Sequence, residues 1–144
     1  MNDIKIRLSD KYNIDAVVLS VGDDVCVIVS GGDAPHIGAV STGVFDCGVG
    51  AAPVHMQDVS NKNEKPLLTQ LYPGQTATLV LPSHKEGVVS EMLAKELSAR
   101  LEKNVTVLCG IHVDDLSKEG IAEIVDIMKK SGERIAMCIS GTVK

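Results

Sequence analysis

The second half of the chain predicts a strand, a long helix and another strand in succession. The two outer segments, TATLVLP at 76–82 and NVTVLCGIHV at 104–113, are rich in β-branched residues, which is typical of strands. Between them, residues 83–103 place apolar side chains at helical spacing, and Ser83 and Glu86 have the spacing of a capping box. Two strands joined by a helix run parallel through a right-handed crossover, so this unit predicts a sheet with a helix packed on it.

A further helix and a closing strand are expected after this unit. Ser117 is a candidate N-cap for a helix over about 117–131, whose apolar positions recur at helical spacing. A lysine pair and Gly132 then have the composition of a helix C-terminus. Residues 134–140, RIAMCIS, are mostly apolar and predict the last strand.

The N-terminal part of the chain predicts antiparallel strands. Residues 3–9 alternate apolar and charged side chains, as in a strand with one buried face. Residues 14–21 and 25–30 are apolar, β-branched runs on either side of a Gly-Asp-Asp turn, and residues 37–45 have the composition of another strand. We therefore expect an antiparallel meander.

Together these segments predict one α+β domain over residues 1–144. Its mixed β-sheet would combine the N-terminal antiparallel meander with a β-α-β-α-β C-terminal part, and its two helices would pack on one face. Residues 46–73 show no clear periodicity and are expected to form a variable, loop-rich excursion.

Composition narrows the class of protein. The net charge of −5 and the aromatic content of 2% disfavour nucleic-acid binding, which uses basic surfaces and stacking side chains. The four cysteines lack metal-ligand spacing. The chain starts without an apolar signal sequence and has no apolar run of the roughly 18 residues that a membrane span requires. We expect a cytoplasmic protein that binds neither nucleic acid nor membranes.

The glycine-rich stretch SGGDAPHIGAV, residues 30–40, allows two interpretations. Its glycines could arrange successive amides into an anion-binding nest, although the stretch lacks the spacing of a P-loop. Alternatively, it is a hairpin loop in which Asp33 forms an Asx-turn and Pro35 stiffens the chain. A plain turn does not account for His36, and the sequence leaves both interpretations open.

Two further stretches place polar residues at the carboxyl edge of the sheet. His84 follows one strand of the parallel unit and His112 ends the other, and ligands of open α/β sheets bind at that edge. Lys85 would lie in the first helical turn, where a phosphate would offset its unfavourable interaction with the helix dipole. A plain cap with an exposed lysine is the alternative. Asp114 or Asp115 could fix the tautomer of His112.

Metal binding and catalysis are weaker interpretations. Ligand types that suit a metal are present at His36, His84, His112, Asp33 and Asp114. No two histidines have the local spacing of a metal site, so we expect no bound metal. A nucleophile could come from Ser41 or Ser83 beside a histidine and an aspartate, but the motif of a serine hydrolase is missing. Cys47 lies outside the expected strands and could be reactive.

Three stretches together, GGDAPHIGAV, PSHKE and GIHVDD, resemble the prenylated-flavin chaperones typified by the accessory subunit of gallate (hydroxyarylic acid) decarboxylase. The motifs occur in the same order as in that family, and the segment 46–73 contributes nothing to the resemblance. The resemblance implies a fold similar to that of proteasome assembly chaperones, in a small, non-catalytic protein that forms a homodimer.

The same resemblance implies that the chain binds prenylated FMN, or FMN, and holds the cofactor for a UbiD-type decarboxylase or delivers it there. A UbiX-type prenyltransferase would make the cofactor. The implied cofactor-binding residues form three walls: Gly31, Gly32, Asp33, Pro35, His36 and Gly38; Ser83, His84, Lys85 and Glu86; and His112 and Asp114. Two other functions stay open: an assembly chaperone for decarboxylase subunits that binds no cofactor, and a small metal-dependent hydrolase.

Overall fold

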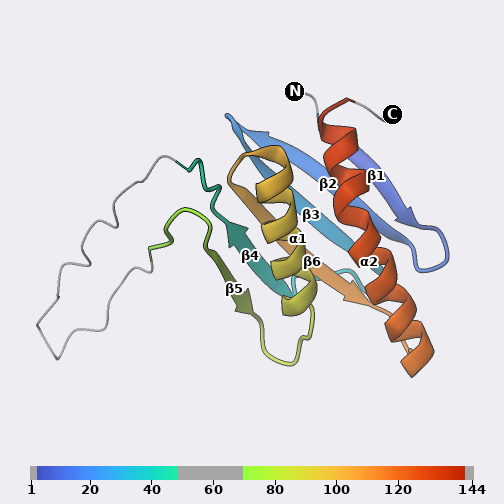
Figure 1. Cartoon of the computed structure of the whole chain (residues 1–144). Helices are drawn as coiled ribbons and strands as arrows, with labels where there is room; N and C mark the ends of the chain where they lie inside the picture. Colours follow the sequence, from blue (N-terminus) through green and yellow to red (C-terminus); the bar gives the residue numbers. More distant parts are fainter. Residues whose placement is uncertain (1–2, 49–69, 142–144) are drawn as a thin grey trace, which may run out of the picture.

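The computed structural model describes residues 3–48 and 70–141, which form one mixed sheet with two helices (Figure 1). The strands in this part of the chain are β1 (Ile4–Ser9), β2 (Ile14–Val21), β3 (Asp24–Gly32), β4 (Ala39–Gly43), β5 (Thr76–Val80) and β6 (Val105–His112). The helices are α1 (Gly87–Leu101) and α2 (Lys118–Ile139). The predicted α+β class is confirmed, whereas the likeness to proteasome assembly chaperones stays a prediction. Most of the excursion expected at 46–73 lies outside the described residues.

The order of the strands differs from a simple meander. Across the sheet the order is β1-β2-β3-β6-β4-β5, in which β1, β2 and β3 are antiparallel neighbours as predicted. The prediction that the strand at 37–45 continues this meander is wrong, because β6 lies between β3 and β4. β6 is parallel to β3 and antiparallel to β4. The chain between β3 and β4 therefore crosses the end of β6 instead of forming a hairpin.

The carboxyl ends of β3, β5 and β6 lie at one edge of the sheet. β3 and β6 are parallel and in register up to the pair Gly32 and His112. β5 is antiparallel to β4, which is antiparallel to β6, so β5 and β6 run in the same direction, as predicted, with β4 between them. The loops that follow these three strands, residues 33–38, 81–86 and 113–117, therefore meet at this edge, which we call the loop edge.

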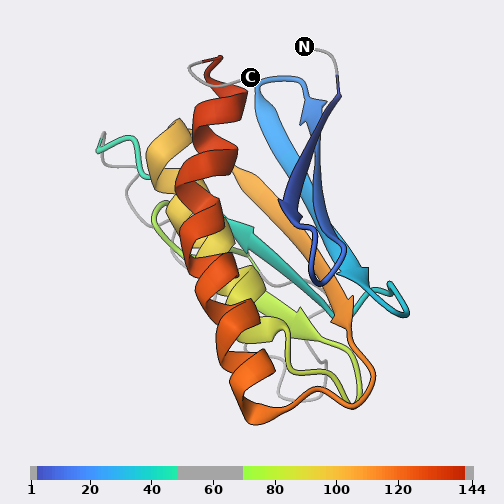
Figure 2. The same cartoon turned by 90° about the vertical axis from the view of Figure 1, so that its right-hand side faces the viewer.

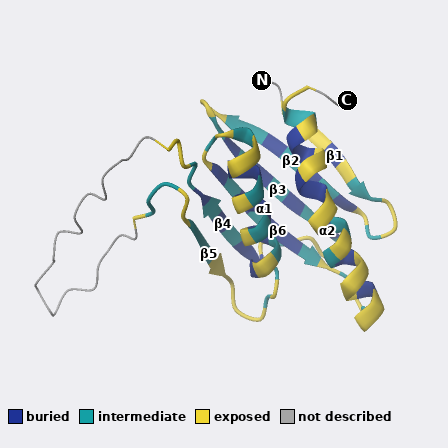
Figure 3. Ribbon diagram, in the orientation of Figure 1, coloured by how far each residue is buried: buried dark blue, intermediate teal, exposed yellow. Residues whose placement is uncertain are grey.

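Both helices pack on the same face of the sheet, as predicted (Figure 2). Alternate strand residues are buried against the helices, while those on the other face are half-buried (Figure 3). Leu93 and Leu97 of α1 and Met128 and Ile135 of α2 are fully buried in this core. Burial of each such side chain stabilises the fold by about 1.5–3 kcal/mol. Neither of the two described helices is both long and apolar enough to cross a membrane.

The start of α1 differs from the prediction of a helix beginning near residue 83. The helix starts at Gly87, and Glu86 is its N-cap, with no hydrogen bond from its side chain to the helix amides. Ser83 has a φ of +67°, which no capping residue of a standard box adopts. The predicted capping box is therefore absent, because the Glu86 carboxylate is engaged in tertiary contacts described below.

The second helix is longer than predicted. Ser117 caps it as expected, accepting a hydrogen bond from the Gly120 amide at 3.0 Å. The strand predicted at 134–140 is wrong, because α2 continues through these residues to Ile139. Gly132 does not end the helix: a Cβ atom there would overlap the Glu96 carboxylate of α1, so this glycine permits close packing of the two helices.

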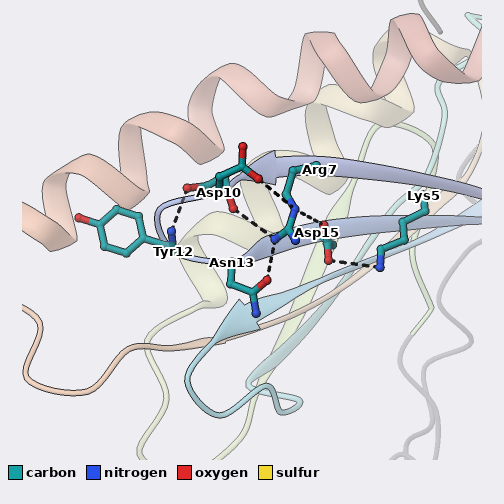
Figure 4. Close-up of polar contacts among 7 residues, drawn as sticks. Lys5, Arg7, Asp10, Tyr12, Asn13 and Asp15 are labelled. Atoms are coloured by element: carbon teal, nitrogen blue, oxygen red, sulfur yellow. Dashed lines mark hydrogen bonds and ion pairs between the residues drawn. The ribbon is translucent and has the colours of Figure 1, made fainter.

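The turn between β1 and β2 supports the end of β3. Arg7 lies 3.2 Å from the Asp15 carboxylate and donates to the side-chain oxygen of Asn13 at 2.6 Å (Figure 4). In the same turn, the carbonyl oxygen of Tyr12 accepts the Gly32 amide at 3.0 Å. The last residue of β3 is thereby held where the crossing loop begins.

Candidate functional site

Residues 33–38, here called the crossing loop, pass over the end of β6, and two glycines permit this close approach. Gly110 lies beneath the loop, where a Cβ atom would overlap the carbonyl oxygen of His36. Gly32 has a φ of +79°, in the left-handed region that favours glycine, and a Cβ atom there would overlap the His112 carbonyl oxygen. The loop therefore packs against β6 and carries His36 toward the start of α1.

The first amides of this connection are already hydrogen-bonded within the protein. The Gly32 amide donates to Tyr12, as described above, and the Asp33 amide donates to the His112 carbonyl oxygen at 2.6 Å. The Ala34 amide donates to the same oxygen at 3.4 Å. The interpretation of the glycines as an anion-binding nest is therefore not supported, and neither is the hairpin. An anion at the loop edge would depend on side chains.

The crossing loop and the loop before α1 bring together His36, His84 and Glu86, which we call the histidine–glutamate cluster. Nε2 of His36 lies 3.1 Å from Oε1 of Glu86. The ring of His84 stacks on that of His36, with centroids 4.3 Å apart and an interplanar angle of 28°. Nδ1 of His84 lies 3.9 Å from the other carboxylate oxygen of Glu86. Two of the three walls predicted from the sequence thus meet directly.

The contacts of both ring nitrogens fix the orientation of His36. Its Nδ1 is 3.0 Å from the carbonyl oxygen of Ala34. Because a carbonyl oxygen only accepts, Nδ1 carries the proton of this bond. Nε2 faces Oε1 of Glu86 at 3.1 Å. These two contacts fix the orientation of the His36 ring between the Ala34 carbonyl and the Glu86 carboxylate.

The Glu86 carboxylate is held from two further sides. Its Oε2 accepts the Lys85 amide at 3.0 Å. The carboxylate also lies against the α-carbon of Gly38, where a Cβ atom would overlap Oε2. Glycine at position 38 is therefore required for this arrangement, and the side chain of Glu86 is only 15% exposed.

The third predicted wall lies beside the cluster. His112 is near His36, with ring centroids 6.3 Å apart in an edge-on arrangement. Nε2 of His112 lies 3.0 Å from Oδ1 of Asp114, as the predicted tautomer-fixing contact requires. The Asp114 amide donates to the Asp33 carboxylate at 2.8 Å, which ties the crossing loop to the end of β6. Gly31, Pro35 and Ser83 contribute no side-chain contact to the cluster: Gly31 packs on the backbone of Asn13, and the other two are exposed.

An apolar cavity of about 200 Å³ lies between α1, β6 and α2, next to the cluster. Of the residues predicted to bind a cofactor, Lys85 and Glu86 line it, at its polar end. The remaining lining residues are Val89, Cys109, Ile111, Val113, Leu116, Ile121, Ile124, Val125 and Met128. The sequence did not reveal this cavity, because apolar residues at helix and strand spacing are indistinguishable from ordinary core.

Cys109 is the one cysteine in the wall of the cavity. Burial, together with the nearby negative charge of Glu86, raises the pKa of its thiol to about 12. The thiol therefore stays protonated near neutral pH and contributes an apolar surface instead of a nucleophile.

The three alternative nucleophiles, Ser41, Ser83 and Cys47, lie in different surroundings. Ser41 is fully buried and hydrogen-bonds to Ser90 and Thr78 at 2.7 Å each, so it lies in the core beneath α1 and not beside a histidine. Ser83 is exposed on the loop before α1. Cys47 is exposed at the end of the first described stretch.

Comparison with known proteins gives two matches. Residues 8–72 and 49–140 match the family model described as the prenylated flavin chaperone LpdD-like domain. The chain is also 28% identical over 116 residues to Protein LpdD of Lactiplantibacillus plantarum, an alignment that covers 77% of this chain. The match spans 65% of the length of that relative.

Proposed function

The chain belongs to the family of LpdD-like prenylated flavin chaperones, and on this premise we propose that it binds prenylated FMN and holds it for transfer to a decarboxylase. Membership of a chaperone family agrees with the prediction of a non-catalytic protein. The observation that carries the proposal is an apolar cavity whose polar end is formed by Lys85 and Glu86, beside two histidines. A prenylated flavin has the same division into an apolar ring system and a charged phosphate.

The cavity would take the apolar part of the ligand. Its volume of about 200 Å³ is below the roughly 300–1,000 Å³ of pockets that enclose drug-sized ligands. Part of the flavin would therefore lie outside it. The exposed side chains of Pro35 and Ile37 at the crossing loop offer further apolar contacts there. A second subunit could cover what remains.

Lys85 and the start of α1 would bind the phosphate. The first turn of a helix presents amides without intrahelical partners and the positive end of the helix dipole, and both favour an anion. Lys85 lies just before the N-cap residue Glu86 and is exposed, so its ammonium could bind a phosphate at this end of the helix.

We further propose a UbiD-type decarboxylase as the recipient and a UbiX-type prenyltransferase as the source of the cofactor. Transfer requires that a recipient can reach the bound ligand. The site has this property, because Asp33, Lys85 and His112 are exposed at the loop edge and Lys85 also lines the cavity.

Co-expression with a UbiX-type flavin prenyltransferase tests the proposal. The purified protein is expected to carry about one flavin per site, measured by its ultraviolet–visible spectrum and by mass spectrometry of the released cofactor. Lys85→Ala should lower the flavin content severalfold, because it removes the cation nearest the phosphate. A colourless product that also fails to bind added flavin would overturn the proposal. If such a product still captured a decarboxylase subunit, it would be an assembly chaperone without cofactor.

We also propose that the protein is a homodimer that associates through the helix-free face of the sheet. Five apolar residues lie directly opposite one another across five strands on this face: Val17, Ile28, Leu108, Val40 and Leu79. Leu79, on the edge strand β5, is 74% exposed. A row of this kind is typical of a surface that a partner covers.

Leu79→Glu is expected to convert the dimer into a monomer of 15.2 kDa, because it places a charge in this apolar row. The dissociation constant should rise at least about tenfold, equal to about 1.4 kcal/mol. Multi-angle light scattering across a concentration series measures the change. Val88→Glu is the matched control, since Val88 is 79% exposed on α1, which covers the opposite face of the sheet. Equal effects of the two substitutions would contradict the proposed interface.

A further inference from the structure

We propose that the histidine–glutamate cluster is a binding site for one divalent transition-metal ion, and that Zn²⁺ suits it best. His36, His84 and Glu86 each offer one ligand atom, and these atoms all lie within 4.8 Å of one another. The ligand atoms of a tetrahedral zinc site lie roughly 3.3–3.4 Å apart, as follows from zinc–ligand distances of about 2.0–2.1 Å. A small rotation of the half-buried His84 side chain would close this difference.

The donor set matches the preferences of such an ion. Two imidazole nitrogens and one carboxylate oxygen are the three protein ligands of many zinc sites that keep an open position, and they also suit other first-row divalent metals. Sequence inspection could not find this set, because His36 and Glu86 are 50 residues apart and only the crossing loop brings them together. We expected no bound metal because the sequence has no pair of histidines at local spacing. This site does not need such a pair, because its ligands come from two separate loops.

The hydrogen bond on the far side of His36 supports the assignment independently. In metal sites, the ring nitrogen that does not bind the ion commonly donates to a backbone carbonyl, which fixes the tautomer and the direction of the other nitrogen. Nδ1 of His36 makes such a bond to the Ala34 carbonyl oxygen at 3.0 Å. Nε2 is thereby directed at Glu86, and a metal ion would lie between these two groups.

The carboxylate is also held in place before any ion arrives. Glu86 occupies the N-cap of α1, where a carboxylate ordinarily accepts from the helix amides, yet its side chain makes no such bond. It is held toward the histidine rings by the Lys85 amide and by its contact with Gly38. Ser83, which precedes His84, adopts a left-handed φ of +67°, and strain of this kind occurs where a backbone positions functional side chains.

A bound ion would change the chemistry of the loop edge. With two neutral imidazoles and one carboxylate, a divalent ion keeps a net positive charge and at least one open coordination position. This position would accept an anionic oxygen, from water or from phosphate, beside the polar end of the cavity. The metal site does not depend on the proposed flavin, and either could exist without the other.

Isothermal titration calorimetry with ZnCl₂ tests the proposal. The sample is the full chain with the Cys47→Ser substitution, free of flavin and treated with a chelator. One ion per chain should bind with a dissociation constant in the micromolar range or below. His36→Ala, His84→Ala and Glu86→Gln should each weaken binding at least tenfold. His112→Ala and Glu91→Gln are the matched controls and should leave it unchanged, since His112 pairs with Asp114 and Glu91 lies on the exposed side of α1. Circular dichroism establishes that each variant is folded.

A measurement on the unsubstituted site keeps the test decisive if a variant fails to fold. Co²⁺ is titrated in place of Zn²⁺, and X-ray absorption at the cobalt edge identifies the ligands. Nitrogen and oxygen donors with two imidazoles are expected. Absence of binding, sulfur ligation, or binding that the three substitutions leave unchanged would each overturn the metal site. None of these results bears on the flavin proposal, because no flavin is present.

Discussion

Gly110→Ala is expected to lower the free energy of unfolding by about 3 kcal/mol, the upper end of the usual cost of overpacking. The methyl group would overlap the carbonyl oxygen of His36, which is backbone and cannot move aside as the end of a flexible side chain can. Relief requires the whole crossing loop to lift from β6. Chemical denaturation followed by circular dichroism measures the change, and flavin content should fall with it because His36 leaves its place beside Glu86.

Gly22→Ala is the matched control for this substitution. Gly22 has a φ of +60° in the β2–β3 turn, and a Cβ atom there meets no other atom within 4 Å. Alanine at this position should cost only about 1 kcal/mol, from the left-handed backbone alone. If Gly110→Ala destabilised no more than Gly22→Ala, the crossing loop would not be packed tightly on β6, and the cluster would not be held in the way described.

Val89→Phe is expected to weaken flavin binding about 100-fold, which corresponds to about 2.7 kcal/mol, while leaving the fold intact. Val89 lines the apolar cavity, and the larger ring would occupy the space proposed for the flavin. Filling an existing cavity adds little strain, so the free energy of unfolding should change by less than about 1.5 kcal/mol. Fluorescence titration with reduced and oxidised prenylated FMN measures the affinity.

Val88→Phe separates occupation of the cavity from a general effect on α1. Val88 precedes Val89 on the same helix but is 79% exposed and does not line the apolar cavity. The same change in size there should leave flavin affinity within a factor of about two. Equal loss in both variants would place the ligand elsewhere, and unchanged affinity in Val89→Phe would show that the cavity is not used.

Local sequence patterns predicted most of the sheet. The strand at 14–21 has the predicted bounds, because β-branched residues on both faces and an adjacent turn leave few alternatives. The closing strand at 134–140 was wrong, since a short apolar run does not distinguish a strand from the buried end of a helix. Ile135 lies on the same buried side of α2 as Ile124 and Met128. This shared burial favours a helix over a strand at residues 134–140.

The candidate site was predictable only where it depends on strand direction. His84 and His112 were placed at one edge because a helix links two strands that run the same way. His36 comes near the other two histidines because β6 pairs between β3 and β4. No local sequence pattern predicts this strand order. Glu86 had the spacing of a capping residue, and its contact with His36 overrides that local preference. The cavity stayed hidden because its walls have the composition of a core.

The position of β6 between β3 and β4 has a consequence for how the chain is made. β6 begins at Val105, more than sixty residues after β4 ends at Gly43. A nascent chain that has not yet released β6 from the ribosome carries β3 and β4 with unsatisfied edges, and such edges pair readily with other chains. Non-local pairing of this kind slows folding. A protein proposed to shelter a cofactor in transit is therefore exposed to aggregation during its own synthesis, until β6 inserts into the middle of the sheet.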